Sequence, residues 1–186
     1  MGHTWMELFE RIEGCEACGL CKTRKRVVPG EGNPRAQLML IGEGPGAEED
    51  DQGRPFVGAS GALLTAMLHS VGIERTEVYI ANVVKCRPPQ NRTPTPDEAA
   101  ACKVHLRAQF SLILPQVLVL LGATASKYVM DEDVRIRRDH GTWTERKGIW
   151  MMPTFHPSAL LHDPSQKKLA WQDFQAVRQK LKELSS

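Results

Sequence analysis

Five cysteines are the residues of this sequence whose type and spacing most clearly suggest chemistry. Cys15, Cys18 and Cys21 are each separated by two residues, whereas Cys86 and Cys102 lie far along the chain, 16 positions apart. A structural zinc site usually has two closely spaced pairs of ligands. Scattered thiolates instead favour a cubane iron–sulfur cluster, which four cysteines from separate elements can hold. A lone cysteine is more often a small buried apolar residue, but the spacing of Cys15 and Cys18 favours ligation.

A glycine-rich turn followed by acidic residues is the second chemical feature. Glycines occupy positions 42, 44 and 46, and acidic residues occupy positions 48–51. A dinucleotide-binding turn fits poorly, because the third glycine comes one place early, Pro45 has no backbone N–H, and acids stand where a pyrophosphate would arrive. Carboxylates beside such glycines suit a site where positive charge develops, as in the oxocarbenium-like transition state of glycosidic cleavage. The alternative is a strand-to-helix turn whose acids complement the helix dipole.

Three further motifs contain groups that can bind or activate a nucleobase. Phe56 lies between two glycines in the loop 53–58, where its ring could stack on an extruded base or simply belong to the core. The amide of Asn82 offers a donor and an acceptor that match the N3–H and O4 edge of uracil. In the segment 154–161, His156 could donate to a leaving group, and Leu160 or Leu161 could wedge into a duplex.

Four continuous apolar runs predict the strands that must position these groups, with helical patterns between them. The strands are expected at residues 37–41, 78–83, 117–121 and 149–152, and helices at 60–71, 95–112 and 169–184. Continuous apolar strands are typical of a sheet that is covered on both faces. We therefore predict an α/β fold, a three-layer sandwich with a central, mainly parallel four-stranded sheet flanked by helices. The candidate groups follow the first, second and fourth strands, so they should meet at the carboxyl edge of the sheet.

Length and composition are those of an ordinary globular protein. The chain has 186 residues, of which 41% are hydrophobic and 25% charged, and we expect a single domain over residues 1–186. No apolar run approaches the ~20 residues of a membrane helix, and the N-terminus does not resemble a secretory signal, so we expect a cytoplasmic protein. The net charge is only +2, but basic clusters at 22–26 and 135–138 suit a polyanion such as DNA. A merely solvated surface is the alternative.

Taken together, these motifs resemble those of the family 4 uracil-DNA glycosylases along nearly the whole chain. The matching stretches are 42–46 with Glu49 and Asp50, the loop 53–58, residues 82–89, residues 91–94 and residues 156–158. The resemblance implies the uracil-DNA glycosylase fold and hydrolysis of the N-glycosidic bond of deoxyuridine in DNA. Uracil would be released and an abasic site left for base excision repair, in single- or double-stranded DNA, by a monomer.

The resemblance also implies a role for each matching residue. Phe56 would stack on uracil and Asn82 would read its edge beside Gly42 and Gly44, while His156 would stabilise the departing uracil anion. The residues implied in catalysis are His156, Glu43, Glu49 and Asn91, and those implied in DNA binding are Ser158, Leu160 and Leu161. Related glycosylases carry a water-activating aspartate at the position of Gly44, so Glu43 is favoured only weakly for that role. His162 departs from an arginine that many relatives have after the paired leucines.

The metal ligands implied by the resemblance are Cys15, Cys18, Cys86 and Cys102, holding a 4Fe-4S cluster, with Cys21 spare. Such a cluster would tie the N-terminal segment 1–35 to the second strand and the helix after it. Two other functions stay open at this stage. One is a uracil-DNA-binding protein of the relative family that traps DNA covalently through a loop histidine. The other is a zinc-stabilised nucleotide-binding domain without catalysis.

Overall fold

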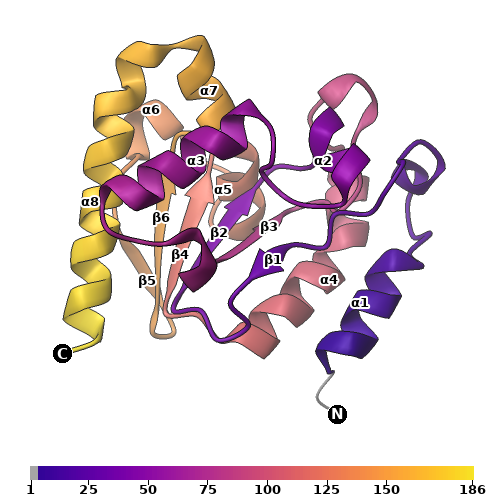
Figure 1. Ribbon diagram of the computed structural model, residues 1–186, viewed down its shortest axis with the longest axis horizontal. Coiled ribbons are helices and arrows are strands. Elements are labelled where there is room, and N and C mark those ends of the chain that lie inside the picture. The colour runs from indigo at the N-terminus through magenta and orange to yellow at the C-terminus, as the bar shows by residue number, and fades with distance from the viewer. Residues whose placement is uncertain (1–3) are drawn as a thin grey trace.

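A mixed sheet of six strands forms the centre of the computed structural model, which describes residues 4–186 (Figure 1). The strands are β1 (Glu31–Gly32), β2 (Leu38–Gly42), β3 (Tyr79–Asn82), β4 (Val117–Leu121), β5 (Thr144–Arg146) and β6 (Ile149–Thr154). Their order is β1-β3-β2-β4-β6-β5. The inner four run parallel and coincide with the predicted runs, whereas β1 and β5 pair antiparallel at the edges. The α/β class with a mainly parallel sheet is confirmed, but four strands was too few.

The two edge strands were missed because they are short and lack an apolar run. β1 has two residues and β5 has three, and neither contains a fully buried side chain. The sequence patterns used for prediction detect strands that bury apolar side chains, and a two- or three-residue edge strand has no such pattern. Each strand pairs through its backbone with a neighbour that was itself predicted correctly.

Helices cover both faces of the sheet. They are α1 (Trp5–Glu13), α2 (Ala47–Gln52), α3 (Ala59–Ser70), α4 (Pro96–Ile113), α5 (Ala123–Val129), α6 (Ile136–Asp139), α7 (Pro157–His162) and α8 (Lys167–Leu184). The helices predicted at 60–71, 95–112 and 169–184 correspond to α3, α4 and α8. The predicted start of α4 is confirmed, because Thr95 Oγ1 accepts from the Glu98 backbone N–H and Glu98 Oε2 accepts from the Thr95 N–H.

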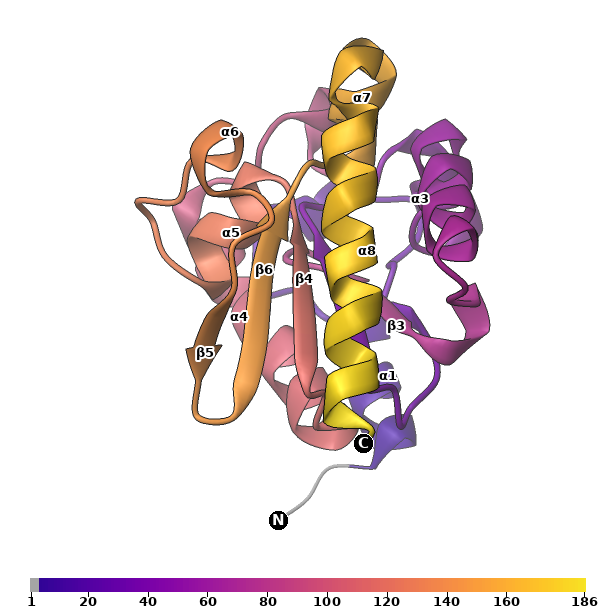
Figure 2. The same cartoon turned by 90° about the vertical axis from the view of Figure 1, so that its left-hand side faces the viewer.

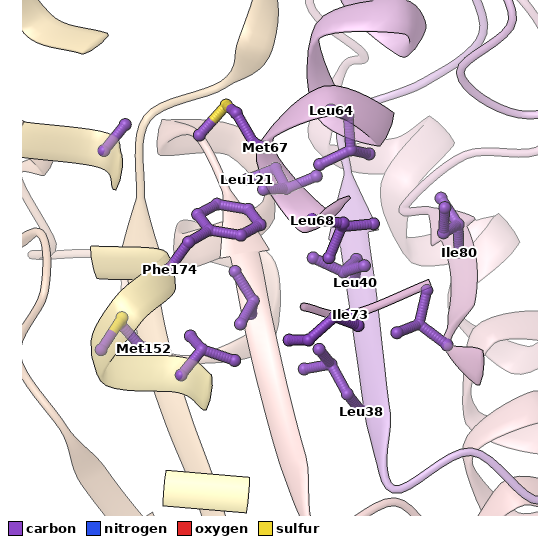
Figure 3. Packing of buried hydrophobic residues seen from close by; sticks show 14 of the residues in the cluster. Leu38, Leu40, Leu64, Met67, Leu68, Ile73, Ile80, Leu121, Met152 and Phe174 are labelled. Atoms are coloured by element: carbon purple, nitrogen blue, oxygen red, sulfur yellow. The ribbon is translucent and has the colours of Figure 1, made fainter. Parts of the chain in front are cut away.

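Each inner strand contributes side chains to both faces, which explains the continuous apolar runs. In β2, Leu38 and Leu40 pack toward one face, while Met39 and Ile41 pack toward the other. Figure 2 shows α3 and α8 on one side of the sheet and α4 and α5 on the other. In Figure 3, Phe174 of α8 points toward β4 and α3, close to the side chains with which it shares one buried cluster.

The second face carries a different layer. Helix α4 packs against it, and α1 lies against α4 on the outside (Figure 1). The chain between α1 and β1 returns along this side, where the Val28 N–H donates to the Lys85 carbonyl. The first three residues of the predicted segment 1–35 lie outside the described residues. No helix within residues 4–186 combines the length and the apolar character needed to cross a bilayer.

Candidate active site and cysteine cavity

A pocket of about 210 Å³ opens at the carboxyl ends of β2, β3 and β6. It is lined by Glu43, Gly44, Pro45, Gly46, Glu49, Phe56, Ser60, Asn82, Pro88, Asn91, Arg92, His156 and Ser158. The residues predicted to bind a base and to carry out catalysis therefore meet in one place, with Gly42 directly behind them. Ser60 was not singled out from the sequence, whereas Pro88 and Arg92 were noted only as parts of the matching stretches 82–89 and 91–94, without a role.

Asn82 lies at the floor of this pocket with an unused hydrogen-bond acceptor. Its side chain is 1% exposed, and Oδ1 has no hydrogen-bond partner among the described residues. A buried polar atom without a partner is costly, so its presence in a native structure calls for a ligand or water. Asn82 ends β3, and its position is set by the parallel pairing of β3 with β2.

Gly42 keeps the space beside Asn82 open. A Cβ at position 42 would lie 2.5 Å from Asn82 Oδ1 and 2.7 Å from Phe56 Cζ, so any side chain would push these two groups aside. At Gly44, a Cβ would lie 2.8 Å from Val84 Cγ2. An aspartate at position 44 would therefore require a shift of Val84, which gives a physical reason for its absence here.

Phe56 is held in a strained backbone conformation next to His156. Its φ is +50°, a region that side-chain-bearing residues rarely adopt, and the residue is 6% exposed. The guanidinium of Arg75 donates to the Phe56 carbonyl at 2.9 Å and to the Pro55 carbonyl at 2.6 Å. The Phe56 and His156 ring centroids are 5.5 Å apart at an interplanar angle of 33°. The fold thus fixes this ring at the pocket wall.

The two candidate carboxylates have different surroundings. Glu49 is 8% exposed, and its oxygens accept from the backbone N–H groups of Gly46, Val57 and Gly58 at 3.0–3.1 Å. Its carboxylate is therefore occupied in joining the glycine-rich turn to the Phe56 loop. Glu43 is half-buried, and only its Oε2 has a hydrogen bond among the described residues, from the hydroxyl of Thr124.

Thr124 is a functional neighbour that sequence reasoning missed. It follows β4, the strand between those that carry the other groups, and lies in the first turn of α5. Its position after a parallel strand was the available clue, because side chains at that edge approach the same site. The hydroxyl orients Oε2 of Glu43, a residue that lines the pocket.

The hydrogen bonds of His156 determine its tautomer. Its Nδ1 accepts from the Ser158 backbone N–H at 3.1 Å and lies 2.7 Å from the Ser158 hydroxyl. Because a backbone N–H can only donate, Nδ1 carries no proton and the proton of the neutral ring lies on Nε2. Burial lowers the pKa of His156 to about 4, although the nearby Glu49 acts in the opposite direction. At neutral pH the ring is an uncharged donor through Nε2.

The paired leucines of α7 do not share a role. Leu160 is fully buried in the core cluster beneath α3 and α8, so the prediction that it contacts DNA was wrong. Leu161 is 43% exposed and borders a shallow hollow beside the pocket, together with Ser158 and His162. Consecutive helical residues point about 100° apart, so one of two adjacent leucines faces inward when the other faces out.

All five cysteines line a second cavity, on the α4 side of the sheet. Cys86 and Cys102 are buried, while Cys15, Cys18 and Cys21 are half-buried. Arg24 Nη1 donates to Cys86 Sγ at 3.2 Å, and the Lys85 backbone N–H donates to Cys102 Sγ at 3.3 Å. Burial raises the pKa of the Cys102 thiol to about 11, with nearby Lys85 acting against that rise.

The residues that line this cavity are suited to holding an iron–sulfur cluster. Thiols reach it from the segment after α1, from the loop after β3 and from α4, and two N–H donors already point at sulfur atoms. Within residues 4–186 no three metal-binding side chains converge closely enough to hold a single ion. Thiols spread around a common cavity, with N–H groups donating to sulfur, suit a larger group held by several thiolates.

Comparison with known proteins relates the chain to one family. The family model described as the uracil DNA glycosylase superfamily matches residues 29–175. A type-4 uracil-DNA glycosylase of Thermotoga maritima is 48% identical over 179 residues, which cover 93% of this chain and 92% of that protein. The type-4 enzyme of Sulfurisphaera tokodaii is 43% identical over 182 residues, 93% of this chain and 83% of that one. A type-5 enzyme of Thermus thermophilus matches only 52% of this chain, at 40% identity.

Proposed function

This chain belongs to the uracil-DNA glycosylase superfamily, and on that premise we propose that its pocket hydrolyses the N-glycosidic bond of deoxyuridine in DNA. Uracil is released and an abasic site remains, as base excision repair requires. The observation that carries this proposal is the unpartnered Oδ1 of Asn82, buried beside Phe56 at the floor of the pocket. An acceptor of this kind needs a donor, and the N3–H of uracil supplies one.

Base recognition follows from the groups around Asn82. Once Oδ1 accepts from N3–H, the amide Nδ2 donates to O4, so both atoms of the amide are used. The ring of Phe56 stacks on the flat face of the base, which occupies the slot that Gly42 leaves open. Cytosine presents the reverse pattern on this edge and would leave buried groups unpaired. The nucleotide must be extruded from the stack to enter, at a cost of a few kcal/mol.

The neutral His156 stabilises the leaving group. Cleavage of the glycosidic bond places negative charge on the uracil ring, and Nε2–H donates to its O2. The hydrogen bond strengthens as the charge develops, so it lowers the barrier rather than merely improving binding. Ser158 holds the ring in the tautomer that makes this possible.

Glu43 is the carboxylate we assign to the sugar side of the reaction. Its free Oε1 accepts from the attacking water and lies near the positive charge that develops on the sugar. Glu49 is a positioning residue, because its oxygens are already bonded to three backbone N–H groups. Asn91, whose Oδ1 accepts from Arg87 Nε at 2.8 Å, keeps its amide N–H groups for the water or a phosphate.

Leu161 and Ser158 form the proposed DNA contact at the pocket rim, together with Arg92, which also lines the pocket, and Arg87, which donates to Asn91. Leu161 is the exposed apolar side chain that can fill the space left by the extruded base. The cations neutralise phosphates, and the pocket accepts a nucleotide from single- or double-stranded DNA. We propose that the protein acts as a monomer in the cytoplasm.

We further propose that Cys15, Cys18, Cys86 and Cys102 hold a 4Fe-4S cluster. Cys15 and Cys18 come from the segment after α1, Cys86 from the loop after β3 and Cys102 from α4, and all four line the same cavity. A bound cluster would cross-link the segment 1–35 to the end of β3 and to α4, a structural contribution without a redox step in the reaction. The unmutated protein is expected to contain about four iron and four sulfide per chain. Mutation of any of these four cysteines to serine should cause loss of the iron and sulfide, whereas Cys21→Ser should not. Protein that contains zinc but no sulfide would refute the assignment.

The decisive experiment is incubation with a labelled oligonucleotide that contains one uracil, followed by alkali. We expect alkali-sensitive sites at the uracil, more than one per protein molecule, and none in a matched thymine oligonucleotide. Covalent trapping is the alternative, but the loop 90–94 contains no histidine, and His105 lies in the cysteine cavity. A protein–DNA adduct that persists in a denaturing gel would replace turnover with trapping.

A further inference from the structure

Lys85 is a buried cation that has no carboxylate partner within residues 4–186. It directly precedes Cys86 and is 1% exposed. Its Nζ donates to the Asn82 carbonyl at 2.9 Å and to Gln109 Oε1 at 2.7 Å, both of which are neutral. Its backbone N–H donates to Cys102 Sγ at 3.3 Å, and the residue lines the cavity that the five cysteines share. A buried charge without an opposite charge costs several kcal/mol, so the fold implies an anion nearby.

The orientation of Gln109 makes the contact with Lys85 unambiguous. The Gln109 amide Nε2 donates to the Pro29 carbonyl at 2.6 Å and lies 3.1 Å from the hydroxyl oxygen of Tyr79. Its Oε1 is therefore the acceptor that faces Lys85. The ammonium group of Lys85 is thus fixed between the Asn82 carbonyl and Gln109 Oε1, and it does not reach solvent.

The cysteine cavity has cationic side chains and no acidic ones. Lys85 and Arg24 both line it, and no Asp or Glu does so among the described residues. His105 also lines it, with neither ring nitrogen hydrogen-bonded, and burial followed by the nearby Lys85 lowers its pKa. A cubane core held by four thiolates carries about two negative charges in total. The charges of the two cations and of the cluster are thus similar in magnitude and opposite in sign.

We propose that Lys85 is the counter-charge of the iron–sulfur cluster and a positioning residue that couples the cluster to the uracil-reading end of β3. This inference rests on the proposed function, both for the cluster and for the role of Asn82. The ammonium group balances the charge of the cluster from the protein side, while its hydrogen bond to the Asn82 carbonyl fixes the backbone from which the base-reading amide projects. A cluster without an evident part in the chemistry would in this way influence the pocket.

The test separates charge from hydrogen bonding with three variants of the full chain. Lys85→Met removes both, Lys85→Gln removes the charge and keeps a donor, and Lys85→Arg keeps the charge. Lys103→Met is the matched control, since Lys103 is an exposed cation next to a cluster ligand in the sequence. For each, iron and sulfide are quantified, the reduction potential is measured by titration with dithionite, and single-turnover uracil excision is timed.

Removal of a cation near the cluster disfavours its more negative reduced state. Lys85→Met and Lys85→Gln should therefore shift the potential to more negative values, with Lys85→Arg and Lys103→Met close to the unmutated protein. Lys85→Met should also slow excision by ~10-fold or more, and Lys85→Gln by less, because a donor to Asn82 remains. Equal reduction potentials in all variants would show that Lys85 is not the counter-charge of the cluster. Excision by Lys85→Met at the unmutated rate would show that Lys85 does not couple the cluster to the pocket.

Two controls keep this inference separate from the proposed function. If the unmutated protein lacks iron and sulfide, or does not excise uracil, the proposed function fails before any variant is compared. If neither neutral variant folds, Gln109→Glu places a carboxylate against Lys85 while retaining it. The potential should then also become more negative, and an unchanged potential would show that Lys85 and the cluster are electrostatically independent.

Discussion

Two buried polar side chains end β3 and β6, which β2 and β4 separate in the sheet, and their surroundings differ. Asn82 ends β3 with an Oδ1 that has no partner among the described residues. Thr154 ends β6, fully buried, and its hydroxyl donates to Asp173 Oδ2 at 2.6 Å. Asp173 also accepts from His140 Nδ1 at 2.9 Å. The unpaired group marks where a ligand binds, whereas the paired group supports the site from behind.

The paired group lies on the same strand end as His156, the histidine that we propose to be catalytic. Thr154 is two residues before His156, and its carbonyl accepts from the Gly122 N–H at 2.8 Å. The ring of Phe155, between them, lies 4.7 Å from that of His140. Helix α8 thereby orients the end of β6 through Asp173, although it contributes no side chain to the pocket. A preorganised site requires rigid support, which the end of β6 has, and an unpaired hydrogen-bonding group for the ligand, which the end of β3 has.

The largest effect is expected at the unpaired end. Asn82→Ala should slow uracil excision by ~10³-fold, since uracil would enter a pocket that no longer pairs with its edge. Asn82→Asp should also lose uracil activity but gain detectable action on cytosine, because a carboxylate accepts from the N4 amine. The measurement is single-turnover excision from matched uracil and cytosine oligonucleotides. Excision by Asn82→Ala at the unmutated rate would make Asn82 a structural residue.

The next largest effect is expected at His156. His156→Ala should slow excision by ~10²–10³-fold, the usual loss when one donor to a developing anion is removed. The unmutated rate should stay level from neutral pH down to about 5 and fall as the pH approaches 4, where the ring gains a proton on Nδ1 and loses its bond from Ser158. A rate that falls already near pH 6.5 would show that the ring is not held neutral.

The same group makes stability depend on pH. The pKa of His156 is about 4 in the folded chain and near 6.5 when unfolded, so the unfolded chain binds more protons in between. Stability should therefore decrease as the pH falls from about 6.5 to 4, by at most ~3 kcal/mol, and His156→Ala should reduce that slope. Urea unfolding at several pH values measures it, and identical slopes in both proteins would contradict the assignment.

A smaller effect on activity is expected at the paired end. Asp173→Asn keeps the shape but weakens the bonds to Thr154 and His140, so the free energy of unfolding should fall by ~1–3 kcal/mol. Excision well below the melting temperature should slow by no more than ~10-fold, because His156 keeps its own bond from Ser158. Asp97→Asn, on the exposed side of α4, is the control and should cost under about 1 kcal/mol. A loss of activity as large as that of His156→Ala would place Asp173 in the chemistry.

The smallest effect on chemistry is expected in α7, where the two leucines provide a matched pair. Leu160→Ala should destabilise the protein by ~2–5 kcal/mol, because it opens a cavity in the core. Leu161→Ala should barely change stability but should weaken binding to uracil-containing duplex more than to a single strand, where no stack must be filled. Equal loss on both substrates would argue against a wedge.

Several elements could be predicted from local sequence because their patterns are strong. The inner strands were found as continuous apolar runs, and the helices α3, α4 and α8 by helical periodicity and caps. Helix α1 was missed although Thr4 and Glu7 form a capping box at its start. Trp5, Leu8, Phe9 and Ile12 recur along it at helical spacing, so the pattern was present in the sequence and the prediction simply omitted it.

The chemistry of the pocket was visible in the sequence because parallel strands end at one edge. Residues after β2, β3 and β6 had to meet there, whatever the details of their packing. The different roles of Glu43 and Glu49 could not be predicted in this way, because both residues follow the same strand, β2. It depends on which backbone N–H groups the Phe56 loop turns toward Glu49, and on Thr124, which comes from a strand elsewhere in the chain.

The sequence by itself determined which chemically active residue types follow which apolar strand. From this we could predict a base-binding pocket at the carboxyl edge of the sheet and a set of cysteines suited to a cluster. Only the tertiary structure decided which of two adjacent leucines is core, which carboxylate is free, and that Lys85 lies buried between Asn82 and the cysteine cavity. Apolar periodicity is a property of neighbours in sequence. Whether a polar group is paired depends instead on atoms brought from distant segments, which only packing can place.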